Sequence, residues 1–456
     1  MIFKFKPIKI RYLIYYLANL ISAILLMIES GKDWKAIVLV PLSLLMVTKP
    51  LSLIPMLFVS SWSITFVALP GLAAYFYYLV LFFVSIVVAL IFNEKAVSFV
   101  SKIPAARWAL VFAIWIAVNG FFSISGKWYG AVKLSLFIVP LFLVSRFRFK
   151  EMDFCRTSID IVAAFFSVYC FYVMLFAPAL YYSDTGTVGS NSLRSNMNPN
   201  TASQIVLVLF TIMYSEVFRT KKYWLMLFAA LNAGTLMILG SRTAFFTMAI
   251  IAIVYLMLVL KTSVWKKMLL FCGCLAAFFV VYSLSSSFER FDRLNISSIE
   301  EDQGSGRFYT WEVLLTEVVP YHWVRGVGVD KANYQNLPIY TLDADNLYVD
   351  LLTATGIVGF LLFFTYYASN LLHLFRFRKK KRDWDFLIAI FLAQLFEGIG
   401  ESVYDLPLIW FFGFLSMLAI NDLKYAEDST KQESEPEPAL DAPEKWTPPY
   451  YLKLNK

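Results

Sequence analysis

The chain has 456 residues, of which 59% are hydrophobic, and its formal net charge is +8. The apolar residues fall in stretches long enough to cross a hydrocarbon core about 30 Å thick, and short basic clusters separate these stretches. This pattern excludes an ordinary soluble domain, and it assigns the positive charge to loops at a membrane surface rather than to nucleic-acid binding. The sequence therefore predicts an all-α, polytopic integral membrane protein.

Hydropathy predicts about 14 transmembrane helices, with about 12 as the lower bound. In chain order they lie near residues 11–29, 36–48, 51–69, 72–92, 107–122, 131–145, 157–180, 201–218, 223–239, 243–260, 268–285, 346–372, 384–402 and 406–420. The second and third spans are short, and Pro41, Pro50 and Pro55 interrupt them.

The positions of Lys and Arg predict the orientation. An amino terminus in the cytoplasm places every strongly basic connection on that side, as the positive-inside rule requires, and the carboxy terminus is then cytoplasmic too. These connections contain Lys4, Lys6, Lys9 and Arg11; Arg146, Arg148 and Lys150; Arg219, Lys221 and Lys222; Lys261, Lys266 and Lys267; and the run from Arg376 to Arg382. The first span lacks an evident cleavage site, so we expect a retained anchor.

Breaks in the apolar pattern divide the chain into segments. We expect transmembrane helices at 1–180, an outer loop at 181–200, helices at 201–285, a large outer loop at 286–345, helices at 346–420 and an acidic tail at 421–456. Long loops commonly carry function. The tail is rich in Glu, Asp and Pro, so we expect it to be disordered and cytoplasmic, either as a solvated end or as a docking segment.

Scarce cysteine and histidine argue against metal, disulfide and histidine-based chemistry. The cysteines are Cys155, Cys170, Cys272 and Cys274, and the histidines are His322 and His373. The cysteines lie in or beside apolar spans without the spacing of a zinc site, so we expect them to be buried small side chains. We therefore expect no metal and no cofactor.

The large outer loop contains an amphipathic pattern. From Arg307 onward, Phe308, Trp311, Leu315 and Val318 recur at helical spacing. We expect a helix on the outer face of the membrane, with this aromatic and aliphatic stripe resting on the bundle or the lipid. Ser305 is placed to cap this helix and Pro320 to end it.

Arginines stand where predicted helices begin on the outer side. They are Arg194, Arg242 and Arg307, and the helices near Thr201, Thr243 and Asn346 all start at that face. Helix amino termini carry unsatisfied N–H groups and about half a positive charge. Because a guanidinium pairs with phosphate oxygens two at a time, this combination suits a diphosphate at the membrane surface.

A purely structural interpretation of these residues stays open. An arginine near a span end can reach the interface by itself, and Asn198, Ser241 and Asp345 are good helix caps. Arg242, however, has apolar chain on both sides, and a charge so close to hydrocarbon usually has a partner.

At these positions the chain resembles the polysaccharide polymerases and O-antigen ligases of bacterial surface assembly. The similar segments, within residues 190–370, are Asn198-Pro199-Asn200, Gly240-Ser241-Arg242, Arg307 with Trp311, Gly326-Val-Gly328, Asp345-Asn346-Leu-Tyr and Gly356-Ile-Val-Gly359. The resemblance implies a C-type glycosyltransferase of the bacterial inner membrane. It would act at the periplasmic face, without metal or nucleotide sugar, on an undecaprenyl-diphosphate-linked oligosaccharide. Other polysaccharide-assembly proteins are potential partners.

The chemistry of glycan transfer assigns roles to the candidate residues. Arg242 and Arg307 are expected to support the charge on the departing diphosphate, together with Arg194 and Asn200. Asp345 is the candidate base for the acceptor hydroxyl, with Asp343 in reserve, and attack opposite the diphosphate would invert the anomeric configuration. The expected contacts for the acceptor sugar are Asn346, Trp311, Glu397 and Glu401.

Three functions remain as alternatives. Ligases look like they carry a histidine where this chain has Asp345, so the sequence favours a polymerase over a ligase. A glycolipid or sugar transporter is the alternative from another class. Transporters place polar sites near the bilayer midplane, whereas the charges here gather at the outer rim, so we favour an enzyme.

Overall fold

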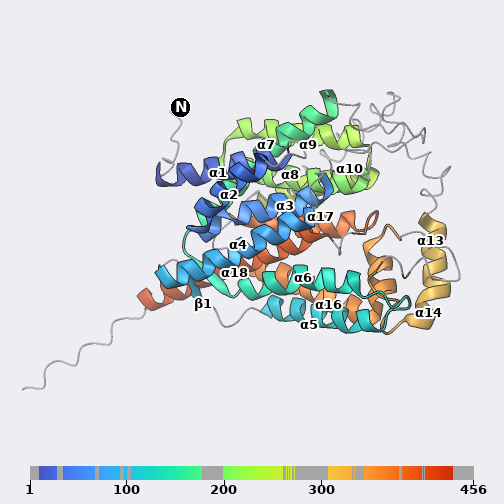
Figure 1. The fold of residues 1–456 in the computed structure, drawn as a ribbon. Coiled ribbons are helices and arrows are strands. Elements are labelled where there is room, and N and C mark those ends of the chain that lie inside the picture. The colour runs from blue at the N-terminus through green and yellow to red at the C-terminus, as the bar shows by residue number, and fades with distance from the viewer. Residues whose placement is uncertain are drawn as a thin grey trace, which may run out of the picture.

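The computed structural model describes residues 10–27, 34–66, 71–92, 97–99, 104–176, 199–259, 307–330, 344–378, 383–402 and 406–434. It also describes the single residues and pairs 263, 265–266, 268–269, 272, 333 and 404, but not residues 403 and 405. Long helices lie side by side in a bundle (Figure 1). They are α1 (Ile10–Met27), α2 (Trp34–Val47), α3 (Ile54–Phe66), α4 (Gly71–Phe92), α5 (Pro104–Phe121), α6 (Tyr129–Val144), α7 (Met152–Phe176), α8 (Pro199–Thr220), α9 (Met226–Leu239), α10 (Arg242–Val259), α16 (Leu347–Phe377), α17 (Asp385–Glu397) and α18 (Pro407–Ser434).

The predicted all-α membrane class is confirmed. A helix lies at every predicted span except 268–285, most of which falls outside the described residues. Four described segments are long and apolar enough to cross a membrane by themselves: Ala74–Phe92, Met152–Tyr172, Ala202–Thr220 and Leu347–Arg376. The total number of spans stays a prediction.

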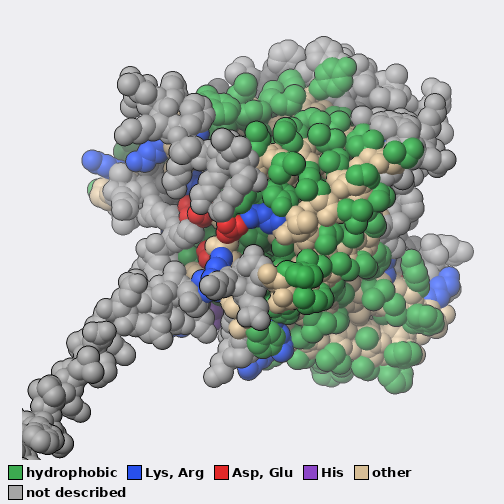
Figure 2. Space-filling view, turned by 60° about the vertical axis from the view of Figure 1, so that its left-hand side comes forward, with side chains coloured by type: hydrophobic (Ala, Val, Ile, Leu, Met, Phe, Trp, Pro, Cys, Tyr) green, Lys and Arg blue, Asp and Glu red, His purple; other side chains and the backbone are tan. Residues whose placement is uncertain are grey.

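The outside of the bundle is apolar, as lipid contact requires. On α4, Val80, Val84, Val87 and Ile91 follow one another at helical spacing, and each is 44–66% exposed. Hydrophobic side chains cover much of the face shown in Figure 2, while its Asp and Glu side chains gather left of the centre, beside Lys and Arg side chains. A soluble protein rarely leaves so much apolar surface uncovered, so this surface is where the hydrocarbon lies.

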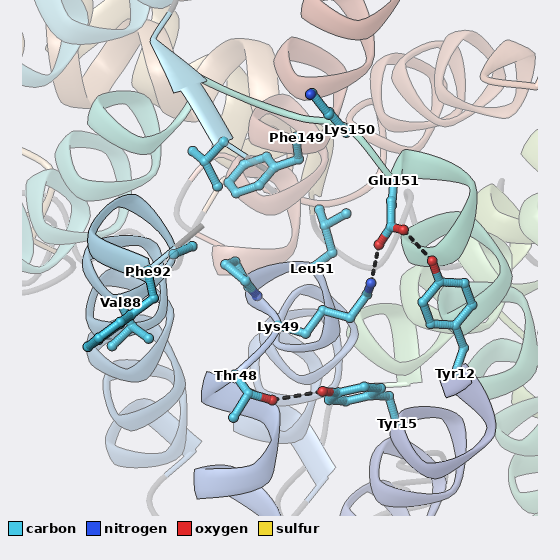
Figure 3. A pocket seen from close by; sticks show the side chains of 13 residues that line it. Tyr12, Tyr15, Thr48, Lys49, Leu51, Val88, Phe92, Phe149, Lys150 and Glu151 are labelled. Carbon is cyan, nitrogen blue, oxygen red and sulfur yellow. Dashed lines mark hydrogen bonds and ion pairs between the residues drawn. The ribbon is translucent and has the colours of Figure 1, made fainter. Parts of the chain in front are cut away.

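One end of the bundle, which we call the basic end, collects connections that are predicted to be cytoplasmic. The strands β1 (Val97–Phe99) and β2 (Phe147–Phe149) pair there in antiparallel fashion. Beside them the Lys49 ammonium pairs with the Glu151 carboxylate, which also accepts a hydrogen bond from the Tyr12 hydroxyl (Figure 3).

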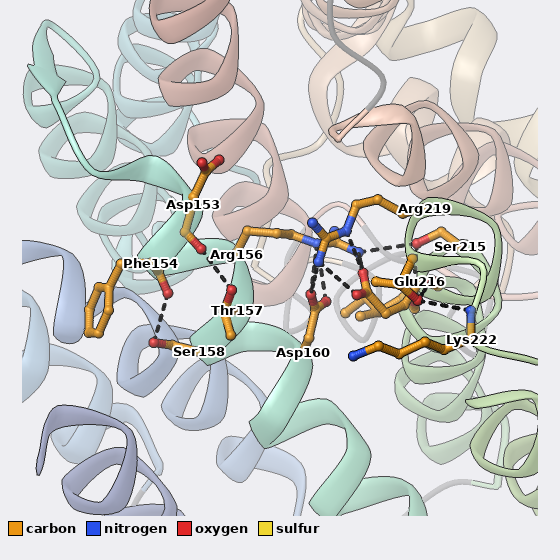
Figure 4. Close-up of polar contacts among 12 residues, drawn as sticks. Asp153, Phe154, Arg156, Thr157, Ser158, Asp160, Ser215, Glu216, Arg219 and Lys222 are labelled. Carbon is orange, nitrogen blue, oxygen red and sulfur yellow. Dashed lines mark hydrogen bonds and ion pairs between the residues drawn. The ribbon is translucent and has the colours of Figure 1, made fainter. Parts of the chain in front are cut away.

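A cluster of buried charges ties α7 to α8 near the basic end (Figure 4). Arg156 on α7 is 2% exposed and lies 3.1 Å from Asp160 and 3.5 Å from Glu216. Arg219 on α8 forms two 2.6 Å hydrogen bonds with Glu216 and lies 3.3 Å from Asp160. The two arginines balance the two carboxylates, so the cluster can stay charged in an apolar environment.

The opposite end, which we call the loop end, carries part of the large loop. Helix α13 (Arg307–Val313), the π-helix η5 (Leu314–Val318) and α14 (Val319–His322) lie across the bundle there (Figure 1). The predicted helix is thus confirmed, but Pro320 does not end it. Pro320 occupies the first turn of α14, where its missing N–H costs nothing. Ser305 lies outside the described residues.

The buried face of this loop helix differs in part from the prediction. Val318 is buried and Trp311 packs beside it, as expected, whereas Phe308 and Leu315 are 52% and 43% exposed. Leu314 takes the inward position instead, because the helix packs against residues around Ala344 at the start of α16. Contact with a segment that is distant in sequence therefore determines which side of the loop helix is buried.

Two smaller predictions also need correction. Residues 421–434 are not disordered, because α18 continues to Ser434, and Lys424, Ala426, Glu427 and Lys431 all favour helices. Cys155 and Cys170 are buried as expected, but Cys272 is exposed. The tail beyond Ser434 and Cys274 lie outside the described residues.

The predicted orientation can be tested with two exposed tyrosines at opposite ends of the bundle. Tyr321 at the loop end is 81% exposed, and Tyr223 at the basic end is 76% exposed. In a cysteine-free background, a membrane-impermeant thiol reagent should label Tyr321→Cys on intact spheroplasts and label Tyr223→Cys only after lysis. Labelling of Tyr223→Cys before lysis would reverse the orientation.

Candidate functional site

The site at the loop end is built on a break in α16. Gly356 interrupts the helix with φ 67° and ψ −177°, a conformation that is essentially restricted to glycine. The span predicted at 346–372 is therefore not one continuous helix. A Cβ at Gly356 would lie 2.2 Å from the Val324 carbonyl oxygen, so the loop backbone also requires glycine here.

Backbone groups released by the break pair with the Gly326-Val327-Gly328 segment and the residues just before it. The N–H of Val327 donates to the Thr353 carbonyl at 2.9 Å, and the N–H of Ile357 donates to the Trp323 carbonyl at 2.7 Å. Gly326 and Gly328 both have positive φ, which allows this close approach. A break inside an apolar bundle is stable only with such replacement partners.

Helix α5 completes the pairing. The Asn119 amide donates to the Arg325 carbonyl at 2.5 Å and to the Ala354 carbonyl at 3.1 Å. The Trp115 indole N–H donates to the Thr355 carbonyl at 3.0 Å. The loop segment and α5 therefore both hold the break in α16 in place.

Asn346 caps the amino terminus of α16. Its Oδ1 accepts hydrogen bonds from the N–H groups of Tyr348 and Val349, and its Nδ2 donates to the Ile399 carbonyl at 2.9 Å. Asn346 is 6% exposed, so the structure gives it a capping role. The bond to Ile399 joins the start of α16 to the turn after α17.

Arg307 and Asp345, which are predicted to share the site, are in direct contact. The Nη2 atom of Arg307 lies 3.2 Å from Oδ2 of Asp345 and 4.0 Å from Oε2 of Glu401. The side chains of Arg307 and Asp345 are 23% and 34% exposed, so solvent or a ligand can reach the pair. One guanidinium thus stands between two carboxylates.

The backbone of Asp345 has a left-handed conformation. Its φ is 44°, which most residues other than glycine avoid but aspartate and asparagine tolerate. Trp311 holds the preceding residue, because its indole N–H donates to the Ala344 carbonyl at 2.6 Å. Trp311 therefore supports the Asp345 carboxylate from behind instead of presenting its N–H to a ligand.

The acidic pair at the end of α17 lies under Arg307. Glu397 and Glu401 are 2% and 7% exposed, and Glu397 interacts electrostatically with Glu401 and Arg307. Helix α17 ends at Glu397, so Glu401 stands in the turn that follows and not on the helix as the predicted span implied. In this turn the Ser402 hydroxyl donates to the Asp350 carboxylate, a contact that the sequence did not indicate.

Arg242 begins α10 at the same turn. A Cβ on Gly400 would lie 2.1 Å from the Thr243 hydroxyl, so the first turn of α10 packs directly beside Glu401. Arg242 is half-buried. The amino termini of α10 and α16 thus meet around the acidic pair, with an arginine from α10 and another from α13 nearby.

The remaining candidates are less closely placed. Asn200 lies in the first turn of α8, whose other end carries Arg219, so it belongs to the loop end and is half-buried. Arg194 and Asp343 lie outside the described residues. In the part of the chain that the structure describes, no group of His, Cys, Asp and Glu side chains could hold a metal ion.

The break in α16 predicts a sharp difference between two glycine substitutions. Gly356→Ala should destabilise the protein by at least ~2 kcal/mol, because strain adds to the clash with the Val324 carbonyl. Gly126 also has positive φ but no atom within 4 Å of an added Cβ, so Gly126→Ala should cost about 1 kcal/mol. Thermal unfolding in detergent checks this order, and equal midpoints would contradict the role of the break.

Comparison with known proteins identifies this region. Residues 227–364 match the family model described as O-antigen ligase, and this segment contains Arg242, Arg307, Asp345 and Gly356. A search of the curated proteins finds no match. The predicted resemblance is confirmed over residues 227–364, which are similar to the O-antigen ligase family and lie within an integral membrane protein.

Proposed function

We propose that this protein is a membrane glycosyltransferase that moves a glycan from an undecaprenyl-diphosphate carrier to a sugar hydroxyl of an acceptor. The reaction would take place at the loop end, on the periplasmic side of a bacterial inner membrane. The observation that carries the proposal is the placement of Arg307 between Asp345 and Glu401, next to the amino termini of α10 and α16.

The donor diphosphate would replace a carboxylate as the partner of the Arg307 guanidinium. The diphosphate offers a guanidinium the same paired oxygens as a carboxylate and carries two negative charges in all, so it can displace Asp345 from Arg307. Arg242 and the two helix amino termini add positive potential at the same place. Asn200 and Arg194 are proposed to complete the contacts to the diphosphate.

The displaced carboxylate would then act as the base. The acceptor oxygen attacks the anomeric carbon, its proton passes to Asp345, and the bond to the diphosphate breaks with the electron pair leaving on the phosphate oxygen. Arg307 and Arg242 stabilise that charge without a metal. One displacement of this kind inverts the anomeric configuration.

The acidic pair would bind the acceptor. Glu397 and Glu401 lie behind the proposed diphosphate position, and carboxylates readily accept hydrogen bonds from sugar hydroxyls. In this arrangement the acceptor enters from the side of α17, opposite the departing diphosphate. Asn346 and Trp311 contribute by fixing Asp345.

The polymerase remains our preferred activity within the family. A carboxylate, Asp345, occupies the place where ligases look like they carry a histidine. The ligase is the second candidate, favoured by the description of the family model that matches residues 227–364.

Arg307 should be indispensable for glycan transfer. Arg307→Ala should lower glycan transfer at least ~100-fold, because it removes the charge that supports the leaving diphosphate. Arg307→Lys should restore little, since an ammonium cannot make the planar paired contact. Arg325→Ala is the matched control, because Arg325 is exposed at the same end and stacks on Phe122 at 5.5 Å instead. Normal transfer by Arg307→Ala would rule out this anion site.

The assignment of the base is tested by comparing two neutralised carboxylates. Asn tolerates the positive φ of residue 345, so Asp345→Asn removes the base and keeps the backbone. We expect Asp345→Asn to lower the turnover at least ~100-fold, and Glu401→Gln to act mainly on the apparent affinity for the acceptor. Loss of turnover in Glu401→Gln with an active Asp345→Asn would move the base to Glu401.

Glycolipids of a deletion strain distinguish polymerase from ligase. A polymerase joins carrier-linked repeats, so its loss should leave a surface lipid with at most a single repeat. A ligase moves the finished chain, so its loss should leave long glycan on the carrier and a bare acceptor. We expect the first profile, and the second would establish the ligase.

A further inference from the structure

A pocket lies at the basic end of the bundle, far from Arg307 at the loop end. Its volume is about 530 Å³, and it is formed by α1, α4, β1, β2 and the connection between α2 and α3 (Figure 3). This volume is typical of sites for small molecules, which measure roughly 300–1,000 Å³. The glycosyl-transfer site uses none of the residues that line it.

One wall of the pocket is apolar and open to the membrane. Val88, Ala89 and Phe92 come from the last two turns of α4, and Val97 comes from β1. Phe92 is 82% exposed, on the helix whose valine and isoleucine stripe covers the outside of the bundle. A hydrocarbon chain can therefore enter along α4 without crossing a polar barrier.

The other wall is polar and held rigidly. The Lys49 ammonium lies 4.2 Å from the centre of the Tyr12 ring and 4.7 Å from that of Phe154, and it pairs with Glu151. The Tyr15 and Thr48 hydroxyls hydrogen-bond to each other at 2.8 Å on the same wall. Lys49 is thus prepositioned, with ammonium protons left for another acceptor.

Lys150 gives the pocket its net charge. It is exposed and pairs with no described carboxylate, whereas Lys49 is balanced by Glu151. Two lysines and one glutamate leave one positive charge at the polar wall. The pocket therefore complements a head group with a single negative charge attached to an apolar chain.

We propose that this pocket binds a glycerophospholipid of the adjoining leaflet whose phosphodiester carries one negative charge. The phosphate binds to the Lys49 ammonium and is attracted by the exposed Lys150, the Thr48 and Tyr15 hydroxyls face the head group, and an acyl chain follows Val88 and Phe92. The bound lipid would contact α1, α4 and β2, all of which line the pocket.

Native mass spectrometry of the purified full-length protein with phosphatidylglycerol tests the proposal. Lys150→Glu reverses the charge of the pocket without touching the Lys49–Glu151 pair, and it should weaken retention of the lipid at least ~10-fold. Lys266→Glu is the matched control, because Lys266 is exposed, lies outside the pocket and makes the same change in net charge. Equal retention in both variants would overturn the proposal.

A second variant tests the apolar wall of the pocket, and three competitors test which head group the pocket binds. Val88→Trp should fill the apolar wall and also weaken retention at least ~10-fold. Phosphatidylcholine should not displace phosphatidylglycerol from the wild-type protein. Displacement by phosphatidylcholine, by millimolar inorganic phosphate or by an equimolar polyprenyl phosphate would overturn the assignment to a monoanionic glycerophospholipid.

Discussion

The exchange of backbone hydrogen bonds between the broken helix α16 and the Gly326–Gly328 segment is the constraint on which the loop end depends. Inside an apolar bundle, a helix can be interrupted only where other groups replace its internal bonds. Here the loop supplies those groups, and Asn119 and Trp115 supply the rest. The large loop is therefore part of the bundle at this point.

This constraint positions the charges. Because the loop is fixed to α16, α13 lies across the start of that helix, and Arg307 meets Asp345 although 38 residues separate them. The cap at Asn346 joins the same place to the turn after α17, which brings in Glu401. The proposed diphosphate site relies on this convergence of cations and helix termini.

Much of this arrangement could be predicted from the sequence. Hydropathy located the helices because each span must satisfy its own backbone in lipid, and that requirement is local. Arg307 and Asp345 could be predicted to lie at the same end of the bundle because topology determines which end of a span each residue occupies. The glycines of the loop and of α16 were visible as motifs.

The rest depends on packing between distant segments. Nothing near Gly356 shows that its span is broken, because the replacement partners come from residues 323–328. The inward face of the loop helix was predicted with Phe308 and Leu315, whereas contact with Ala344 selects Leu314. Glu401 could be suspected from its spacing, but its approach to Arg307 results from the turn after α17.

The most direct test of the account is an assay of the purified protein with an undecaprenyl-diphosphate-linked oligosaccharide and an acceptor glycan. We expect release of undecaprenyl diphosphate together with a longer glycan whose new linkage has inverted configuration. The release of undecaprenyl diphosphate should require the positive charges of the arginines at the loop end. Movement of the intact glycolipid across liposomes without release of undecaprenyl diphosphate would contradict the account and indicate a transporter.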